Sequence, residues 1–448
     1  MNKLIVTALL CLSISLGYSQ DATAAFSLQE AIDYALENNR ASKNASRDIE
    51  AAEKQKWETI STGLPQIDAK VNYQNFLKQQ VSVIPADFVG GQPGDFEEII
   101  FGTKQNVNAT ATLNQLIFDG SYIVGLQSIK VFLALSENAK AKTDLEVRKG
   151  VINAYGNVLL AKESEAIFIK NRDVLRKNLE ETTKIYENGL EEEESVEQLQ
   201  ITLSGIESLL KNATRLKAIA FQMFNIAIGI DLNTNTTLTD TLESLAISNI
   251  SLELLEADES VENTVDYLIA ENDKTSKELL VKLEKSKALP TLSGFINGGY
   301  LSFGNDFTFL ESGQKWSGFS TVGLNLDIPI FSSLGRSAKT QRSEINLEIA
   351  QENLTEIEQQ IKLQIARAKS NYQFSIEEYD VKKLNLRLAE RIETKNETKF
   401  FEGIGSSFEL RQAQTQLYSG QQEFLQAMLD VINAKADLET VLNTPINN

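Results

Sequence analysis

Four segments of the chain alternate apolar and polar residues with a period of two. In the segment of about 66–76, Ile67, Val71 and Tyr73 share one face, and polar residues take the other. The same alternation recurs at about 104–118, 291–302 and 317–331. A period of two indicates β-strands with one apolar and one wet face, and about ten residues is the length of a strand in a membrane β-barrel. A half-buried sheet in a soluble domain would give the same alternation.

The connections within the two strand pairs differ in length. Val81 to Phe101, which contains prolines and glycines, predicts a long loop, and Phe303 to Gln314 predicts a shorter one. Long loops of membrane barrels lie outside the cell, so the first loop is expected there if the strands form a barrel.

Two segments without proline, 119–188 and 334–402, predict very long helices. At 1.5 Å per residue, each would extend on the order of 100 Å. The second segment carries an apolar seam whose eleven-residue repeat suits nearly straight packed helices, although a plain coiled-coil dimer would also fit. The seam consists of Ile357, Ile361, Ile365, Ala368, Tyr372, Ile376 and Tyr379.

Shorter helices are predicted over 27–60, 195–228, 261–287 and 408–442. Ser27 followed by Glu30 three residues later has the pattern of a capping box, which marks the start of the first helix. The stretch 231–258 is rich in Asn, Thr, Ser and Leu and has little helical periodicity, so it predicts a non-helical insert.

The second half of the chain repeats the layout of the first. This predicts a first repeat over 20–230, an insert over 231–258 and a second repeat over 259–448. A unit of this length indicates a duplicated half of a domain and not a solenoid array. The matching landmarks are 64–67 with 289–292, 116–118 with 329–331, and 186–189 with 400–403.

The first 19 residues have the pattern of a secretory signal peptide: Lys3, an apolar run from Leu4 to Leu16, and small residues after it. Cleavage is expected between residues 19 and 24. The apolar run is too short to span a bilayer, so we expect an exported chain.

Composition excludes most catalytic chemistry. The chain has no histidine, and its one cysteine, Cys11, lies in the signal segment. Without these residues there is no Ser-His-Asp triad, Cys-His dyad or ordinary zinc site, so no catalytic residue, metal or cofactor is predicted, and the chain is not expected to be an enzyme. The formal net charge of −19 argues against a nucleic-acid partner, because phosphate binding needs a basic face.

Four strands cannot close a barrel in lipid, because the open edges would leave backbone groups unpaired. Closure would therefore need an oligomer. Two, three or four chains would supply 8, 12 or 16 strands, and only the larger sets leave an open lumen.

The junctions between strand and helix, 112–120 and 322–331, resemble those of the TolC family of outer-membrane efflux proteins. Residues 400–403 with 408–417 resemble the periplasmic tip hairpin of that family, and 186–203 resemble its first-half copy. The resemblance implies a mainly α fold with a membrane β-barrel: a homotrimer with twelve strands, four per chain, continued by a long periplasmic α-helical barrel. Residues 232–256 would help to form an equatorial belt.

The function implied by this resemblance is that of a passive exit duct in the outer membrane, extending into the periplasm. The duct would receive substrates from a periplasmic adaptor protein and an inner-membrane pump. The same architecture serves type I protein secretion, and a structural coiled-coil protein of the envelope is a further alternative.

The resemblance also carries over candidate residues. The acidic constriction of the family falls on Glu409 and Gln412, with Arg411 between them, and its first-hairpin position falls on Ser195. Glu191, Glu192, Glu193 and Glu194 form either a ring of carboxylates at the periplasmic mouth or a solvated start of a helix.

Two further groups complete the candidate set. The tip turns, expected to dock the adaptor, are Gly189, Leu190, Gly403, Ile404 and Gly405. The three glycines are expected to adopt left-handed backbone. Phe118, Pro329 and Phe331 mark the junction of barrel and helix, where the aromatic rings are expected to pack and the proline to end the strand.

Overall fold

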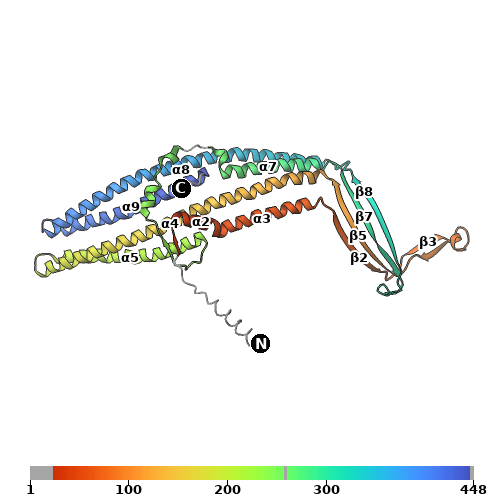
Figure 1. Cartoon of the computed structure of the whole chain (residues 1–448), viewed down its shortest axis with the longest axis horizontal. Helices are drawn as coiled ribbons and strands as arrows, with labels where there is room; N and C mark the ends of the chain where they lie inside the picture. Colours follow the sequence, from red (N-terminus) through yellow and green to blue (C-terminus); the bar gives the residue numbers. More distant parts are fainter. Residues whose placement is uncertain (1–23, 257–259, 444–448) are drawn as a thin grey trace, which may run out of the picture. The chain divides into compact units, whose positions relative to one another are not determined.

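A computed structural model describes residues 24–256 and 260–443 (Figure 1). The predicted signal peptide lies outside these residues. The described chain divides into two compact units, each drawing on both predicted repeats. The helical unit comprises the described residues up to Ile49, Ser136–Glu271 and the described residues from Asn353 onward. The sheet unit comprises Glu50–Leu135 and Asn272–Glu352.

The sheet unit contains the four predicted strands. They are β2 (Gln66–Asn75), β5 (Gln105–Phe118), β7 (Thr291–Gly304) and β8 (Trp316–Asp327). They pair antiparallel in the order β2-β5-β7-β8, so a strand of the first repeat lies beside one of the second. Strand β8 ends at Asp327 and not at 331 as predicted. Pro329, which has no N–H to donate to the ladder, follows two residues later.

The predicted long loop contains a β-hairpin, which the sequence analysis did not predict. β3 (Val81–Pro85) and β4 (Phe96–Ile100) pair antiparallel, with Val83 opposite Glu98. A 3-10 turn, η1 (Ala86–Val89), follows β3. Gly90 and Gly94 have φ of 89° and 102° and supply the left-handed backbone between the strands.

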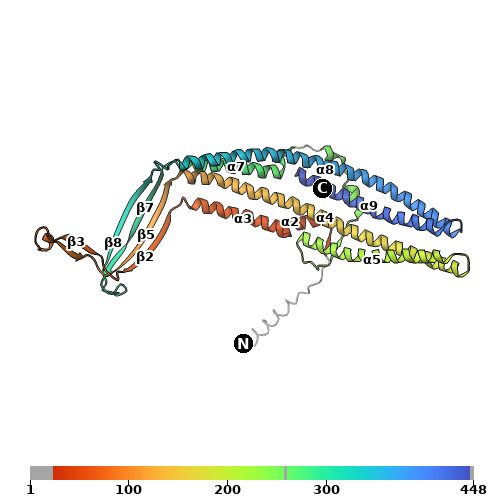
Figure 2. The same ribbon diagram turned by 180° about the vertical axis from the view of Figure 1, so that it is seen from behind.

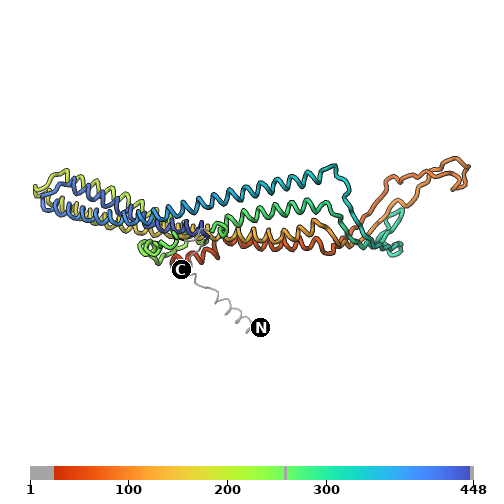
Figure 3. The backbone as a smooth tube through the Cα atoms, turned by 90° about the horizontal axis from the view of Figure 1, so that it is seen from above, coloured from red at the N-terminus to blue at the C-terminus, as the bar shows by residue number. Residues whose placement is uncertain are grey.

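The long helices are confirmed as α4 (Gly120–Glu187) and α8 (Gly335–Phe401). Each contributes residues to both units. In the helical unit they turn back as α5 (Glu193–Ile228) and α9 (Ser407–Leu442), and Figure 2 shows the resulting two hairpins. In Figure 3 both hairpin turns lie at the same end of this unit.

The predicted helix over 27–60 is two helices, α2 (Leu28–Asn38) and α3 (Arg40–Ser61). The capping box at Ser27 and Glu30 is confirmed. The break occurs at Asn39, whose φ of −59° and ψ of 140° are not helical. Its side-chain oxygen accepts from the Ala41 N–H at 2.7 Å, and its amide donates to the Ala227 carbonyl at 2.7 Å. Asn39 therefore caps the second helix while holding it against α5.

The insert over 231–258 was expected to be non-helical, and this was wrong. It contains α6 (Leu242–Ser248) and the 3-10 turn η2 (Leu252–Glu256). The Thr241 hydroxyl caps α6 by accepting from the Ser244 N–H at 3.2 Å. The insert also contains β6 (Thr236–Leu238), which pairs parallel with β1 (Ala24–Phe26). After the insert comes η3 (Val261–Asn263), and α7 (Val265–Ser286) begins four residues later than predicted.

The core of the helical unit lies around the seam predicted on α8. Ile361, Ile365, Tyr372 and Tyr379 are all at least nine-tenths buried and share one cluster with side chains of α2, α4, α5, α6 and α9. The fully buried Tyr372 donates its hydroxyl to the Asn249 carbonyl at 2.5 Å and accepts from the Ser251 N–H at 2.9 Å. Packing on α8 thus fixes the insert.

Candidate functional site

The sheet has one apolar face. One row across it reads Ile67, Leu113, Ile296 and Val322, each opposite the next in the pairing register. Ile67 is 73% exposed and Val322 is 78% exposed. Other large apolar side chains of this face are exposed as well: Val71, Tyr73, Tyr300, Leu324 and Leu326. Within the described chain, Phe307 and Phe309 pack against Tyr73 on this face, and most of its other large apolar side chains named above stay exposed.

The other face of the sheet is mainly polar. The neighbouring row reads Asp68, Thr112, Asn297 and Thr321. Because successive residues of a strand point to opposite faces, a step of one residue exchanges the apolar row for the polar row. The sheet therefore separates an apolar surface from a wet one.

The two edges of this sheet are open within the described chain. β2 pairs only with β5, and β8 only with β7. Each edge strand carries a row of backbone donors and acceptors that another strand could pair with. The first and last strands therefore provide the two surfaces along which copies of the chain could join.

The second hairpin turns at Gly403, which has φ of 73°. The Gly403 N–H donates to the Phe400 carbonyl at 3.0 Å, and the Ile404 N–H donates to the Lys399 carbonyl at 2.9 Å. Gly405 does not have the expected left-handed backbone. Its missing side chain instead allows close packing, because a Cβ there would lie 2.9 Å from Lys399 Cβ. Ile404 is 72% exposed at the apex.

Glu409 closes a capping box at the start of α9. The Glu409 N–H donates to the Ser406 hydroxyl at 3.2 Å, and the Ser406 N–H donates to the Glu409 carboxylate at 3.3 Å. Glu409 and Gln412 are both exposed. Arg411 lies over the ring of Phe408, 5.5 Å from its centroid, and no ion pair within the described residues joins it to Glu409.

The first hairpin turns at Gly189, with φ of 75°, and exposes Leu190 at its apex. Its returning helix starts differently from α9. Glu192 occupies the N-cap position but makes no side-chain capping bond. The buried Ser195 donates its hydroxyl to Glu191 at 2.7 Å. The carboxylates of Glu192, Glu193 and Glu194 are exposed, as a solvated start of a helix requires.

A polar layer between the two hairpins was not predicted. The Asn171 amide of α4 donates to Gln421 of α9 at 2.8 Å, and the Asn178 amide donates to Glu397 of α8 at 3.0 Å. Ser164 donates to Gln422 at 3.3 Å. These three α4 residues are seven apart, and this spacing is the sequence signal that could have revealed the layer. Buried polar contacts of this kind specify the register of packed helices.

Glu393 and Tyr418 lie near this layer. Burial raises the pKa of the Glu393 carboxyl, and the neighbouring Glu397 carboxylate raises it further. Burial also raises the pKa of the Tyr418 hydroxyl, and both glutamates add to that rise. Tyr418 packs against the α4 and α5 side chains of the first hairpin. Bringing a second negative charge to this contact therefore costs free energy.

The two junctions of strand and helix expose their aromatic rings within one chain. Phe118 is 40% exposed and Phe331 is 82% exposed, so packing within one chain does not hold these rings. The bend is held instead by Arg336, whose guanidinium donates to the Pro329 carbonyl at 3.0 Å. Ser333 and Leu334 have φ of 48° and 63°, left-handed backbone where the chain enters α8. That these rings pack at the junction of barrel and helix therefore stays a prediction about the assembled protein.

Among the described residues, no group of three or more His, Cys, Asp or Glu side chains is placed to hold a metal ion. Of the helices that the structure describes, none combines the length and the apolarity needed to cross a membrane.

Comparison with known proteins finds a family model that is similar to the second half of the sequence, and solved structures that are similar in fold. The family model described as "Outer membrane efflux protein" matches residues 266–444. The search of curated proteins found no match. Solved structures match nearly the whole chain. Their sequence identities are low, so these matches show a shared fold alone.

Three solved structures illustrate this fold. The CmeC outer membrane channel of Campylobacter jejuni is 18% identical with a TM-score of 0.71, covering 93% of this chain and 85% of its own. CusC, described for its folding and transmembrane channel formation, is 16% identical with a TM-score of 0.73, covering 93% and 91%. The outer membrane protein VceC of Vibrio cholerae is 16% identical with a TM-score of 0.70, covering 93% and 95%.

Proposed function

We propose that the protein is one subunit of an outer-membrane efflux duct, and the match of residues 266–444 to the family model of outer membrane efflux proteins supports this proposal. The duct conducts substrates passively from the periplasm to the exterior. The single observation that supports this most strongly is the four-stranded sheet, which has an exposed apolar face, a polar face and two open edges.

The duct closes by pairing β8 of one subunit with β2 of the next. In a trimer, three subunits with four strands each give a barrel of twelve strands. Pairing of the edges satisfies the backbone groups that lipid cannot. The row containing Ile67 and Val322 then faces lipid, and the row containing Asp68 and Thr321 faces a lumen filled with water.

The helical hairpins form the periplasmic end of the duct, and their turns are the docking surface for a periplasmic adaptor protein. Leu190 and Ile404 are 79% and 72% exposed at the two apices. Small apolar projections flanked by glycine suit insertion between helices of a partner. The adaptor in turn links the duct to an inner-membrane pump, which supplies the energy and chooses the substrate.

The acidic residues at the hairpin turns favour cations at the periplasmic mouth. Glu409 of each subunit is exposed beside the turn of the second hairpin, and Glu192, Glu193 and Glu194 are exposed beside the turn of the first. A mouth lined by one sign of charge raises the local concentration of ions of opposite charge.

Single-channel conductance of the detergent-purified trimer in a planar bilayer tests this function. We expect a cation-selective current whose selectivity falls in Glu409→Gln and in a block replacement of Glu192, Glu193 and Glu194 by glutamine. Glutamine can keep the capping box of α9, so the first variant removes charge and retains the helix start. Ser406→Ala is the matched control, because it removes the cap and retains the charge. A verified trimer that passes no current would refute the duct.

A further inference from the structure

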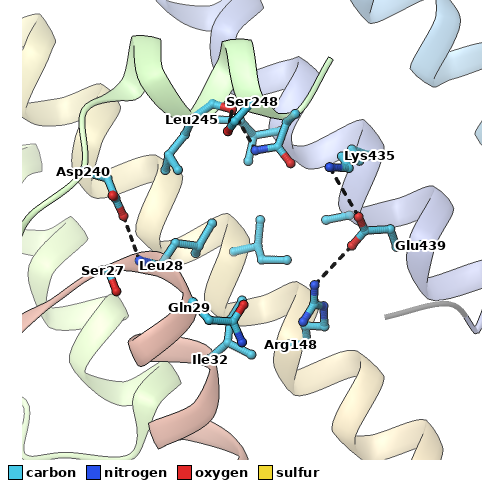
Figure 4. Close-up of a pocket in the computed structure, with 14 residues that line it drawn as sticks. Ser27, Leu28, Gln29, Ile32, Arg148, Asp240, Leu245, Ser248, Lys435 and Glu439 are labelled. Carbon is cyan, nitrogen blue, oxygen red and sulfur yellow. Dashed lines mark hydrogen bonds and ion pairs between the residues drawn. The ribbon is translucent and has the colours of Figure 1, made fainter. Parts of the chain in front are cut away.

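The helical unit contains a pocket of about 230 Å³ between α2, α4, α6 and α9 (Figure 4). Its apolar wall includes Leu28, Ile32, Ile152 and Leu245. Arg148, Lys435 and Glu439 lie together along one side, and Asp240 lies on the opposite side. A pocket that combines an apolar wall with a few converging charged groups can hold and orient a small molecule.

The charged side of the pocket has two cations for one carboxylate. Arg148 Nη2 lies 3.4 Å from Glu439 Oε2, and Lys435 Nζ lies 3.7 Å from Glu439 Oε1. Lys435 is 4% exposed and Glu439 is 6% exposed. Charge-assisted hydrogen bonds are ordinarily about 2.7–2.9 Å long, so both contacts are loose.

The neighbouring residues on the same two helices provide an internal comparison. Lys149 and Asp437, one and two positions away, form an outward pair at 2.8 Å with about half of each side chain exposed. The more exposed pair is therefore closer than the contacts within the trio of Glu439, Arg148 and Lys435, in which Lys435 and Glu439 are buried. A structural ion pair would be expected to show the reverse, because loose pairing of buried charge is costly.

A hydrogen-bond donor on the charged side of the pocket also lacks a partner. Arg148 Nε is buried and has no hydrogen-bond partner. Asp240 does not supply one, because its Oδ2 accepts from the Leu28 N–H at 2.8 Å and from the Tyr155 hydroxyl at 2.8 Å. Asp240 is thus occupied at the start of α2, and its charge disfavours an anion at that end of the pocket.

From these contacts we infer that the pocket is a binding site for a small organic carboxylate with an apolar tail. The carboxylate accepts from Arg148 and Lys435, and the tail lies against Ile32, Ile152 and Leu245. The volume admits a molecule of a few carbon atoms and not one of drug size. Because α2 and α4 belong to the first predicted repeat and α9 to the second, a bound carboxylate links the two repeats.

The test uses hexanoate and its uncharged counterpart hexanamide with the purified full-length trimer. Binding is measured by ligand-observed NMR, and variants are compared in the same detergent so that partition into micelles cancels. We expect the wild type to bind hexanoate more tightly than hexanamide. Lys435→Met and Arg148→Met should each weaken hexanoate binding by about tenfold or more, because each removes one charge-assisted bond.

A third variant should raise the affinity for hexanoate. Glu439→Gln removes the competing carboxylate, so hexanoate should bind more tightly than to the wild type. Lys149→Met is the matched control: it removes the same charge one residue away, outside the pocket, and should leave binding unchanged.

Two results would overturn the proposal. One is equal binding of hexanoate and hexanamide to the wild type. The other is hexanoate binding that Glu439→Gln leaves unchanged or weakens, which would make the trio a purely structural ion pair. The second result stays informative if either cation variant fails to fold, because glutamine is isosteric with glutamate.

Discussion

The helical unit and the sheet unit place their large apolar side chains in opposite environments. On α8, Ile365 and Tyr372 are buried to 1% and 0% exposure among other helices. On β8, Val322 and Leu324 are 78% and 70% exposed. Both segments have a regular apolar stripe. In the helical unit the stripe packs against other helices of the same chain, and in the sheet unit most of it stays exposed.

This difference shows that one chain completes the core of its helices but not the surroundings of its sheet. Exposure of so many apolar side chains on one face marks a surface that lipid or another molecule covers. Lipid would cover the exposed apolar side chains of the sheet, and neighbouring subunits would pair with its two open edges. Variants that act on one unit and spare the other test this account.

The largest expected effect is on the helical core. Ile365→Ala should lower the free energy of unfolding by about 2–5 kcal/mol, because it removes buried methyl groups and leaves a cavity. Leu363→Ala, at a position 52% exposed on the same helix, is the control and should cost much less. Denaturant unfolding in detergent measures both. Equal losses would mean that Leu363 is also covered in the assembled protein.

A charged substitution in the sheet should have an effect that depends on whether it lies on the apolar or the polar face. Val322→Lys is expected to destabilise the membrane-inserted state by about 2–4 kcal/mol, because lysine would face the middle of the bilayer. Thr321→Lys, the adjacent residue on the polar face, should have little effect. Both positions are exposed in the single chain, so a sheet in water would tolerate both equally. The yield of folded trimer in liposomes distinguishes these outcomes.

A smaller effect is expected where the helical core holds the insert. Tyr372→Phe keeps the ring but leaves the Asn249 carbonyl and the Ser251 N–H without their partner. The expected loss is about 1–3 kcal/mol, measured as a lower thermal midpoint. Tyr300→Phe changes a tyrosine 60% exposed in the sheet and is the matched control. An unchanged midpoint for Tyr372→Phe would show that the hydroxyl does not anchor the insert.

The smallest expected effect depends on pH. The pKa of Glu393 is raised from its ordinary value of 4.5 by burial and by Glu397. A carboxyl with a raised folded-state pKa favours folding when protonated, so stability is lost as pH rises through that pKa. Glu393→Gln should therefore stabilise the protein at neutral pH, and the gain should shrink as pH falls towards 4.5. Glu390→Gln, on the same helix and exposed, is the control.

The thermal midpoint between pH 4.5 and 8 measures this effect. A gain from Glu393→Gln that does not vary with pH would show that charge is not its cause.

Much of the fold followed from local pattern. The strands with their period of two, the helices of more than sixty residues and the capping box at Ser27 are confirmed, because each depends on spacing within one segment. Each failure has a specific physical cause. Asn39 breaks a helix by a hydrogen bond to Ala227, a residue far away in the sequence. The hairpin over 81–100 was not predicted, because the glycines that form its turn indicated a loop.

The candidate site was predictable in part. The turns at Gly189 and Gly403 were marked by glycine, and their left-handed backbone is confirmed. Gly405 was placed in the wrong conformation, because close approach to Lys399 and not the sign of φ requires glycine there. The polar layer at Asn171 and Asn178 was not predicted: the seven-residue spacing of polar residues on α4 marks a common face of the helix, but it does not reveal which helix that face contacts.

By itself, the sequence determined where strands and helices lie and which face of each is apolar, because both follow from the period of side chains along the backbone. It also excluded histidine and thiol chemistry. Only the tertiary structure decided that the strand pairs of the two repeats join in one sheet through β5 and β7, that the insert is held by Tyr372, and that Arg148 and Lys435 share one carboxylate. These arrangements join residues distant in the chain, and their energies depend on distances and burial that no local spacing specifies.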